Sequence, residues 1–283
     1  YTVNEKLKLT GGLRFELPGY PDVSQVKEHP LISALTFADG LKINTGVLPK
    51  TKIMVSPRFG FNYDVLGDRS LMLRGGTGVF TGRIPFVWIV SQSGDSGMLQ
   101  ASITKSGPDV PNFSPDIKAN YPATIADPTT SISSSSISVM DPNLKFPSTW
   151  KSSLAFDYKL PFGVVGTLEA IYNKDINAVV ARNVNLADPK EMNIAGYADH
   201  RFIYGDANID KYINKLDKGQ ASSTGKSAFS AIQMSNQKGG HYWSVTAQLA
   251  KAFEDGFSAS LAYTRSGAKN YGDGAGSQIA NLW

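Results

Sequence analysis

Apolar and polar side chains alternate along several segments of the chain, and this period of two limits the fold more than any other feature. In residues 6–17 the odd positions carry mainly Leu and Phe, whereas the even positions carry mainly Lys, Thr, Arg and Glu. Successive side chains of a strand point to opposite faces of its sheet, while an amphipathic helix repeats every 3.6 residues. The pattern therefore predicts a strand with one apolar and one charged face.

The alternation returns in pairs of segments joined by very short turns, centred near residues 67, 162 and 255. Long polar stretches rich in Pro, Ser, Asn and Asp separate the pairs, over residues 18–54, 82–148 and 177–240. Long loops without structure are uncommon in compact soluble domains, but outer-membrane barrels combine short periplasmic turns with long extracellular loops. We predict strands over about 5–17, 55–65, 70–81, 149–160, 164–175, 241–253 and 257–266.

The predicted strands are long enough to cross a bilayer when tilted, because a membrane strand needs about 9–11 residues. Their apolar face would contact lipid, and the charged face would line a wet lumen. Lys251, near the periplasmic end, is the exception that falls on an apolar face. Aromatic residues gather near strand ends, as in interfacial girdles. The predicted lumen-facing residues are Arg14, Arg58, Arg74, Lys151, Asp157 and Glu169.

The sequence thus predicts an all-β fold: a partial antiparallel up-and-down transmembrane β-barrel in the bacterial outer membrane. About seven strands cannot close the wide barrel that such long loops imply, since porins and large transporters use roughly 16–22. We therefore expect residues 1–283 to be part of one larger barrel domain.

Composition excludes several other classes. The chain has no cysteine, which rules out disulfides and thiol chemistry. Its net charge of +4, from 28 basic and 24 acidic residues without a basic cluster, does not indicate nucleic-acid binding. No apolar run approaches the roughly 20 residues of a membrane helix, and residues 1–10 do not resemble a signal peptide.

Two short motifs resemble parts of enzyme active sites, but the other residues that such sites require are missing. Ser93–Gly97 contains GDSG, as around the serine of some proteases, but none of the three histidines lies in a matching context. We interpret it as a polar external loop, and we expect all three histidines at the surface. Gly76–Gly82 lacks the lysine and the following helix of a nucleotide-binding loop. We predict no catalytic residues, no enzyme activity and no cofactor.

No metal site is predicted. The weak candidate is Asp206, Asn208 and Asp210, which have the first spacings of a calcium loop. Lys211 stands where that loop requires Gly, so a solvated turn is the preferred interpretation.

Several motifs together resemble one family. They are Ser56–Asp64, Gly67–Arg69, Leu73–Arg83, Pro142–Trp150 and Tyr172–Asn177. As a set they are similar to the barrel of TonB-dependent receptors of Bacteroidetes, the Oar-like group, over most of residues 5–265. The resemblance implies a 22-strand barrel with an N-terminal plug, energised through TonB. We expect the plug and the TonB-contact segment to lie outside this chain.

The first functional hypothesis is a segment of an active importer of an oligopeptide, glycan or chelate. Its expected partners are outer-membrane lipid, the TonB complex through the plug and a surface lipoprotein lid. Loop residues predicted to contact substrate are Trp88, Asp141, Arg182, His200 and Tyr204.

Two alternatives remain open: a soluble cell-surface sandwich that acts as an adhesin or glycan-binding module, and a passive outer-membrane pore. A sandwich would bury the apolar face against a second sheet, whereas a barrel would expose it as a band.

Overall fold

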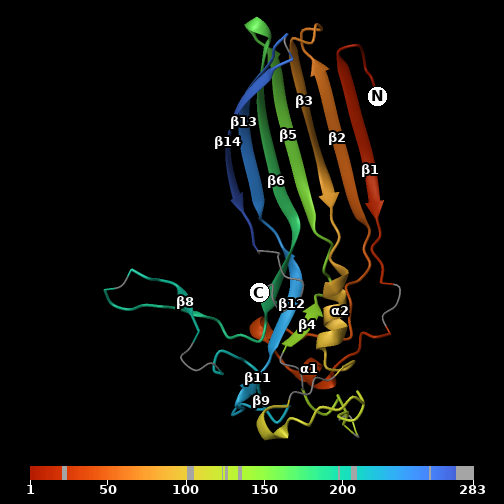
Figure 1. Ribbon diagram of the computed structural model, residues 1–283, viewed down its shortest axis with the longest axis vertical. Coiled ribbons are helices and arrows are strands. Elements are labelled where there is room, and N and C mark those ends of the chain that lie inside the picture. Colours follow the sequence, from red (N-terminus) through yellow and green to blue (C-terminus); the bar gives the residue numbers. More distant parts are fainter. Residues whose placement is uncertain are drawn as a thin grey trace.

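The computed structural model describes residues 1–20, 24–100, 105–122, 124, 127–132, 136–196, 198–204, 209–254 and 256–271. A tall curved sheet forms one end of the molecule, and a smaller packed region lies at its other end, at the bottom of Figure 1. None of the helices in these ranges is long and apolar enough to cross a membrane.

Seven antiparallel strands make the tall part of the sheet, each inside or overlapping one predicted segment. Neighbours in the sheet are also neighbours in the chain, except where the packed region intervenes, so the up-and-down order is confirmed. Their order is β1 (Leu7–Glu16), β2 (Met54–Asp64), β3 (Leu71–Thr81), β5 (Ser148–Lys159), β6 (Val164–Asn183), β13 (His241–Ala252) and β14 (Ser258–Lys269).

The short turns are stabilised locally. Between β2 and β3 the carboxylate of Asp64 accepts hydrogen bonds from the backbone N–H groups of Gly67 and Arg69, at 2.8 and 2.9 Å. Gly67 has a φ of 89°, which glycine adopts without the steric cost of a Cβ. The side chain of Asp64 therefore replaces the backbone partners that so tight a turn cannot supply.

The register sorts the side chains onto two faces, because residues directly opposite in an antiparallel pair share a face. One row runs Leu9, Phe61, Gly75, Leu154 and onward through β6 and β13. Large apolar side chains on this face stay more than a third exposed: Leu13, Phe15, Phe59, Leu154, Phe156, Tyr158, Leu168, Tyr172, Trp243, Val245, Leu249, Leu261 and Tyr263. A sandwich would have buried them, so this face favours the barrel.

Polar groups on the apolar face are largely paired or sit near its ends. Thr77 and Ser152, opposite each other, share a hydrogen bond of 2.7 Å, and the indole N–H of Trp150 donates to Thr77 at 2.7 Å. Lys251 was predicted as the one charge on this face, but the register also places Arg265, opposite Val245, and Lys174, opposite Trp150, on it. Arg265 stands in the same row of the sheet as Leu154, Ala170 and Val245.

Within the described residues the long connecting segments contain helices and strands, so the prediction that they are loops is wrong for those parts. β6 continues past its predicted end at residue 175 and pairs with β12 (Ser230–Gln237), which pairs in parallel with β4 (Ser136–Met140). With α1 (Pro30–Ala34) and α2 (Phe86–Asp95), these strands form what we call the cap. The remaining short elements are the 3-10 helices Ala38–Gly40, Gly107–Asp109 and Pro161–Gly163, with strands β7 (Lys190–Glu191), β8 (Phe202–Ile203), β9 (Lys215–Asp217), β10 (Gln220–Ala221) and β11 (Ser227–Ala228).

The cap has its own hydrophobic core, in contrast to the tall sheet. One cluster gathers around Phe229, which is 1% exposed and meets Phe37 edge to face at a centroid distance of 6.2 Å. A second cluster joins Met140, Ile232 and Met234 to residues of α2 and the segments around it. The apolar residues of these clusters stand in short runs within Ser-rich sequence. Because these segments are polar overall, their composition did not predict a hydrophobic core.

His29 belongs to this core, and the prediction that all three histidines lie at the surface is wrong for it. Its backbone N–H donates to Thr45 Oγ1 at 2.8 Å, and its ring Nε2 lies 3.3 Å from the carbonyl oxygen of Ser131. The side chain is buried, and Nδ1 has no hydrogen-bond partner in the described structure. Burial disfavours the charged imidazolium and lowers the pKa of His29.

Acidification should therefore loosen the cap. A histidine whose folded pKa is depressed gives full stability above its unfolded pKa of about 6.5, and that stability falls as pH decreases toward the folded pKa. We expect limited proteolysis of the cap to accelerate from pH 7 to pH 5. His29→Gln should flatten this part of the pH dependence, while exposed His200→Gln should leave it unchanged; equal profiles for both variants would contradict the assignment.

Candidate functional site

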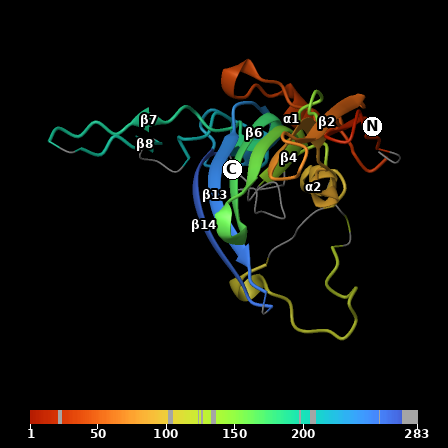
Figure 2. The same cartoon turned by 90° about the horizontal axis from the view of Figure 1, so that it is seen from above.

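The charged face of the sheet lies on its concave side. Seen along the strands, the sheet curves around α2 (Figure 2). Arg14 and Glu16, from the charged face of β1, line a cavity together with Phe86 and Ile89 of α2. The charged face thus points to the side where α2 lies, as the inner wall of a barrel would.

Three predicted lumen-facing residues from three different strands form one ionic cluster. Arg74 Nε lies 2.8 Å from Asp157 Oδ2, and Arg74 Nη1 lies 3.7 Å from Glu169 Oε1. Thr167 Oγ1 donates a further hydrogen bond to Asp157 at 2.6 Å. All are partly exposed, so the cluster contributes little to stability but fixes a polar, wettable surface on the inner wall.

Arg58 and Lys151 form a second inner-wall group around Phe80. The guanidinium carbon of Arg58 is 4.4 Å from the Phe80 ring centroid, and Lys151 Nζ is 5.6 Å from it. Gly78 makes room for this stacking, because a Cβ there would lie 3.0 Å from Arg58 Cγ. Neither cation has an ion-pair partner within the described ranges. The inner wall around Phe80 therefore carries a positive charge.

A partly enclosed cavity with polar and aromatic lining lies at the rim, where the sheet meets the cap. Its volume is about 340 Å³. Arg14 Nη2 pairs with Glu16 Oε1 at 2.7 Å, whereas Glu16 Oε2 is buried without a hydrogen-bond partner in the described structure. We call this the rim pocket; it is lined by Arg14, Glu16, Leu17, Pro18, Gly19, Tyr20, Met54, Thr81, Gly82, Arg83, Ile84, Phe86, Ile89 and Phe146.

The rim pocket combines groups that can hold a small polar solute. The free oxygen of Glu16 can accept a hydrogen bond from a ligand donor, and Arg83 supplies a cation. Tyr20, Phe86 and Phe146 add aromatic surface. Sequence reasoning missed the pocket except for Arg14, because its members come from the ends of three strands, from α2 and from a segment before β5.

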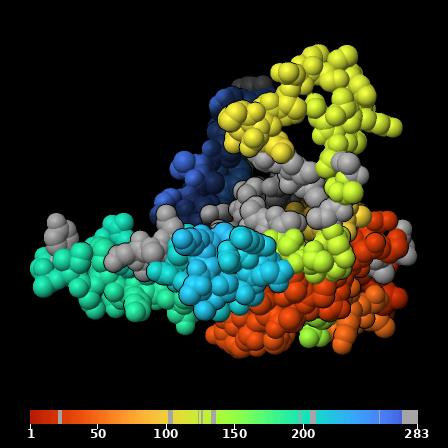
Figure 3. Space-filling model, turned by 90° about the horizontal axis from the view of Figure 1, so that it is seen from below, coloured from red at the N-terminus to blue at the C-terminus, as the bar shows by residue number. Residues whose placement is uncertain are grey.

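The five predicted substrate-contact residues fall into two groups: Trp88, Asp141 and Arg182 belong to the cap, and His200 and Tyr204 belong to the arm of β7 and β8. Trp88 lies on α2 and packs against the second core cluster. The carboxylate of Asp141 accepts a hydrogen bond from the N–H of Asn143, and Arg182 pairs with Asp39 at 2.8 Å. His200, 3.1 Å from Glu191, and Tyr204 lie on the arm of β7 and β8, which projects from the side of the cap (Figures 1 and 3).

The Ser93–Gly97 motif is not the polar external loop that we predicted. Ser93 and Ser96 are buried at the end of α2, and Asp95 Oδ2 accepts a hydrogen bond from Ser138 Oγ at 2.6 Å. Burial raises the pKa of Asp95, with the Ser138 hydrogen bond opposing the shift. These residues hold α2 against β4.

The metal candidate falls largely outside the described residues, because Asp206 and Asn208 lie there. Asp210 is described, and its carboxylate pairs with Lys215 Nζ at 2.6 Å. Among the described residues, no group of three or more His, Asp or Glu side chains is placed to hold a metal ion.

Comparison with known proteins identifies a matching family and two similar solved structures. The family described as "Outer membrane beta barrel domain" matches residues 1–281. Two solved structures are similar, both with a TM-score of 0.39. The outer membrane transporter YddB from Escherichia coli is 9% identical, and the match covers 77% of this chain and 21% of the YddB chain. The copper transporter OprC is 11% identical, and the match covers 93% of this chain and 27% of the OprC chain.

A search of curated proteins found no match. The chain spans 21% of one transporter chain and 27% of the other. The predicted partial transmembrane barrel and its place in the bacterial outer membrane are confirmed by the family match together with the antiparallel sheet. This chain belongs to the outer membrane beta barrel domain family.

Proposed function

We propose that residues 1–283 are part of the barrel domain of a TonB-dependent receptor of the Oar-like group, which imports an oligopeptide, glycan or chelate. The observation that carries the proposal is the two-sided wall: an exposed apolar face outside, charges inside, and a polar pocket at the rim beneath a packed cap. A passive pore is the second candidate, favoured by the wettable inner wall alone.

The inner wall and the rim pocket suggest a division of roles. The cap narrows the outer entrance, and the rim pocket holds a solute through the free oxygen of Glu16, the cation of Arg83 and its aromatic side chains. The cluster around Arg74 and the cations Arg58 and Lys151 keep the wall below it polar. This role needs binding and passage and no bond-breaking chemistry, so we propose no enzyme activity.

Uptake by the intact receptor in cells tests the proposal. We expect accumulation of one among a labelled tripeptide, trisaccharide and ferric chelate, and its loss when TonB is deleted or the proton gradient is collapsed. Accumulation that continues without TonB would support the passive pore instead. No binding or uptake of any of the three probes by a correctly assembled receptor would reject the import proposal.

Glu16→Gln should weaken the binding of the imported probe by about tenfold to a hundredfold. A hydrogen bond to a charged group contributes about 1.5–3 kcal/mol, and the substitution removes both the charge and one acceptor oxygen. Calorimetric titration of the purified receptor measures the effect. Glu254→Gln, an exposed carboxylate beside the turn between β13 and β14, is the matched control and should bind normally. Normal binding by both variants would remove the rim pocket from the uptake path.

A further inference from the structure

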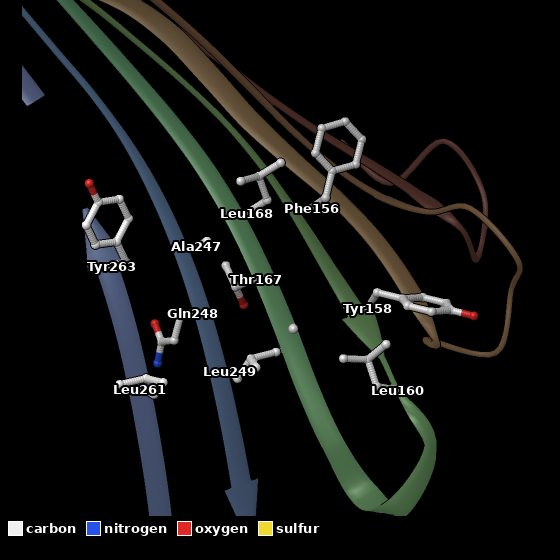
Figure 4. A pocket seen from close by; sticks show the side chains of 11 residues that line it. Phe156, Tyr158, Leu160, Thr167, Leu168, Ala247, Gln248, Leu249, Leu261 and Tyr263 are labelled. Carbon is white, nitrogen blue, oxygen red and sulfur yellow. The ribbon is translucent and has the colours of Figure 1, made fainter. Parts of the chain in front are cut away.

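We propose that the outer face of the barrel binds one phospholipid of the periplasmic leaflet at a specific site, which we call the seat. A groove of about 490 Å³ crosses this face close to the turn between β5 and β6. Nearly all of its surface is apolar. Figure 4 shows its side chains spread over β5, β6, β13 and β14; among them are Phe156, Tyr158, Leu168, Leu249, Leu261 and Tyr263.

Two small residues create the groove. Gly166 lies between Tyr158 and Leu249 in one row across the sheet, and Ala247 lies between Leu168 and Tyr263 in the next row outward. Large side chains therefore stand on both sides of a low floor. A Cβ on Gly166 would lie 3.2 Å from Leu160 Cδ1 and 3.6 Å from Leu249 Cδ2, so any larger side chain here would fill the groove.

A cation stands at the end of the groove that is nearer the turn. Lys251 follows Leu249 by two residues on the same face of β13, opposite Val164. Its Nζ lies 4.6 Å from the Phe253 ring centroid, and Phe253 in turn packs on Phe257 at 5.4 Å. Within the described ranges Lys251 makes no ion pair, so its charge is available to an anionic group.

The spacing fits one phospholipid molecule. Two residues along a strand span about 7 Å, which separates the Lys251 row from the groove floor at Gly166. A phosphate at Lys251 therefore leaves an acyl chain directly over Gly166 and Ala247. The short turns of the barrel are periplasmic, so both parts lie in the leaflet that contains phospholipids. A basic residue beside an apolar groove is the combination that recognises anionic lipid.

Native mass spectrometry of the intact receptor, titrated with phosphatidylglycerol in mild detergent, tests the seat. We expect saturable binding of one lipid molecule. Gly166→Leu should raise its dissociation constant by about tenfold or more by filling the groove, and Lys251→Gln should raise it by about fivefold by removing the charge.

Two matched controls separate the seat from general lipid contact. Ala170→Leu enlarges an exposed residue on the same face of β6, farther from the turn, and Lys159→Gln removes a cation on the opposite face. Both should bind phosphatidylglycerol within about twofold of the unchanged receptor. Equal binding by all variants would overturn the seat, as would retention of lipopolysaccharide in its place or a dimer that Gly166→Leu dissociates. Lys251→Gln keeps the proposal testable if Gly166→Leu fails to fold.

Discussion

Leu154→Arg should reduce the free energy of folding into lipid vesicles by about 2–4 kcal/mol, whereas Ser153→Arg should change it by about 0.5 kcal/mol or less. Leu154 is 41% exposed at the middle of β5 and lies on the apolar face, where a guanidinium would enter hydrocarbon. Ser153 is its neighbour in the same strand, but it points to the charged, wet face. The two substitutions thus introduce the same charge at nearly the same depth in the membrane, but on opposite faces of the sheet.

Urea-dependent unfolding of the intact receptor from phosphatidylcholine vesicles measures both variants. Tryptophan fluorescence reports the transition, since Trp150 and Trp243 lie on the lipid-facing wall. A larger loss for Ser153→Arg than for Leu154→Arg would mean that the two faces of the sheet have been assigned the wrong way round. Similar small losses would indicate that the wall does not lie in lipid.

Phe229→Ala should destabilise the cap by about 3–5 kcal/mol and leave the transmembrane wall intact. Phe229 is 1% exposed in the first core cluster, and Phe37 packs edge to face on its ring. Removing the ring leaves a cavity that the surrounding strands and helices cannot fill without moving. Because the cap has a hydrophobic core of its own, its loss need not spread to the strands in lipid.

Hydrogen exchange of the receptor in vesicles distinguishes the two regions. We expect faster exchange in β12 and β4 of the Phe229→Ala variant, with unchanged protection in β2, β3 and β5. Phe113→Ala provides the control, because Phe113 is 93% exposed outside the core clusters. Loss of protection in cap and wall together would show that the two regions fold as a single cooperative unit.

The wall could be predicted from sequence because its rules are local. A period of two identifies a strand and assigns each side chain to a face, and short Gly-containing turns fix which strands are neighbours. The lumen-facing assignments of Arg74, Asp157 and Glu169 follow from parity alone, and the structure then shows them in contact. Arg265 was not predicted on the apolar face, although it has the same parity as Leu261 and Tyr263 and lies opposite Val245.

The cap could not be predicted in the same way. Its strands are short and carry many Ser residues, so neither length nor alternation separates them from loop sequence. β4 pairs with β12, more than 90 residues later in the chain, and only that pairing buries Ile137, Met140 and Ile232. His29 is buried against Thr45 and Ser131, which are distant in the chain, and the end of α2 is tied to β4 through Asp95 and Ser138.

The sequence by itself determined the two-sided wall, its short turns and its membrane environment, because strand geometry and the cost of charge in lipid act residue by residue. Only the tertiary structure decided the cap core, the rim pocket with the unpaired oxygen of Glu16, and the groove over Gly166. Each of these depends on strand register and on contacts between distant segments, where a shift of one residue would bring different side chains together.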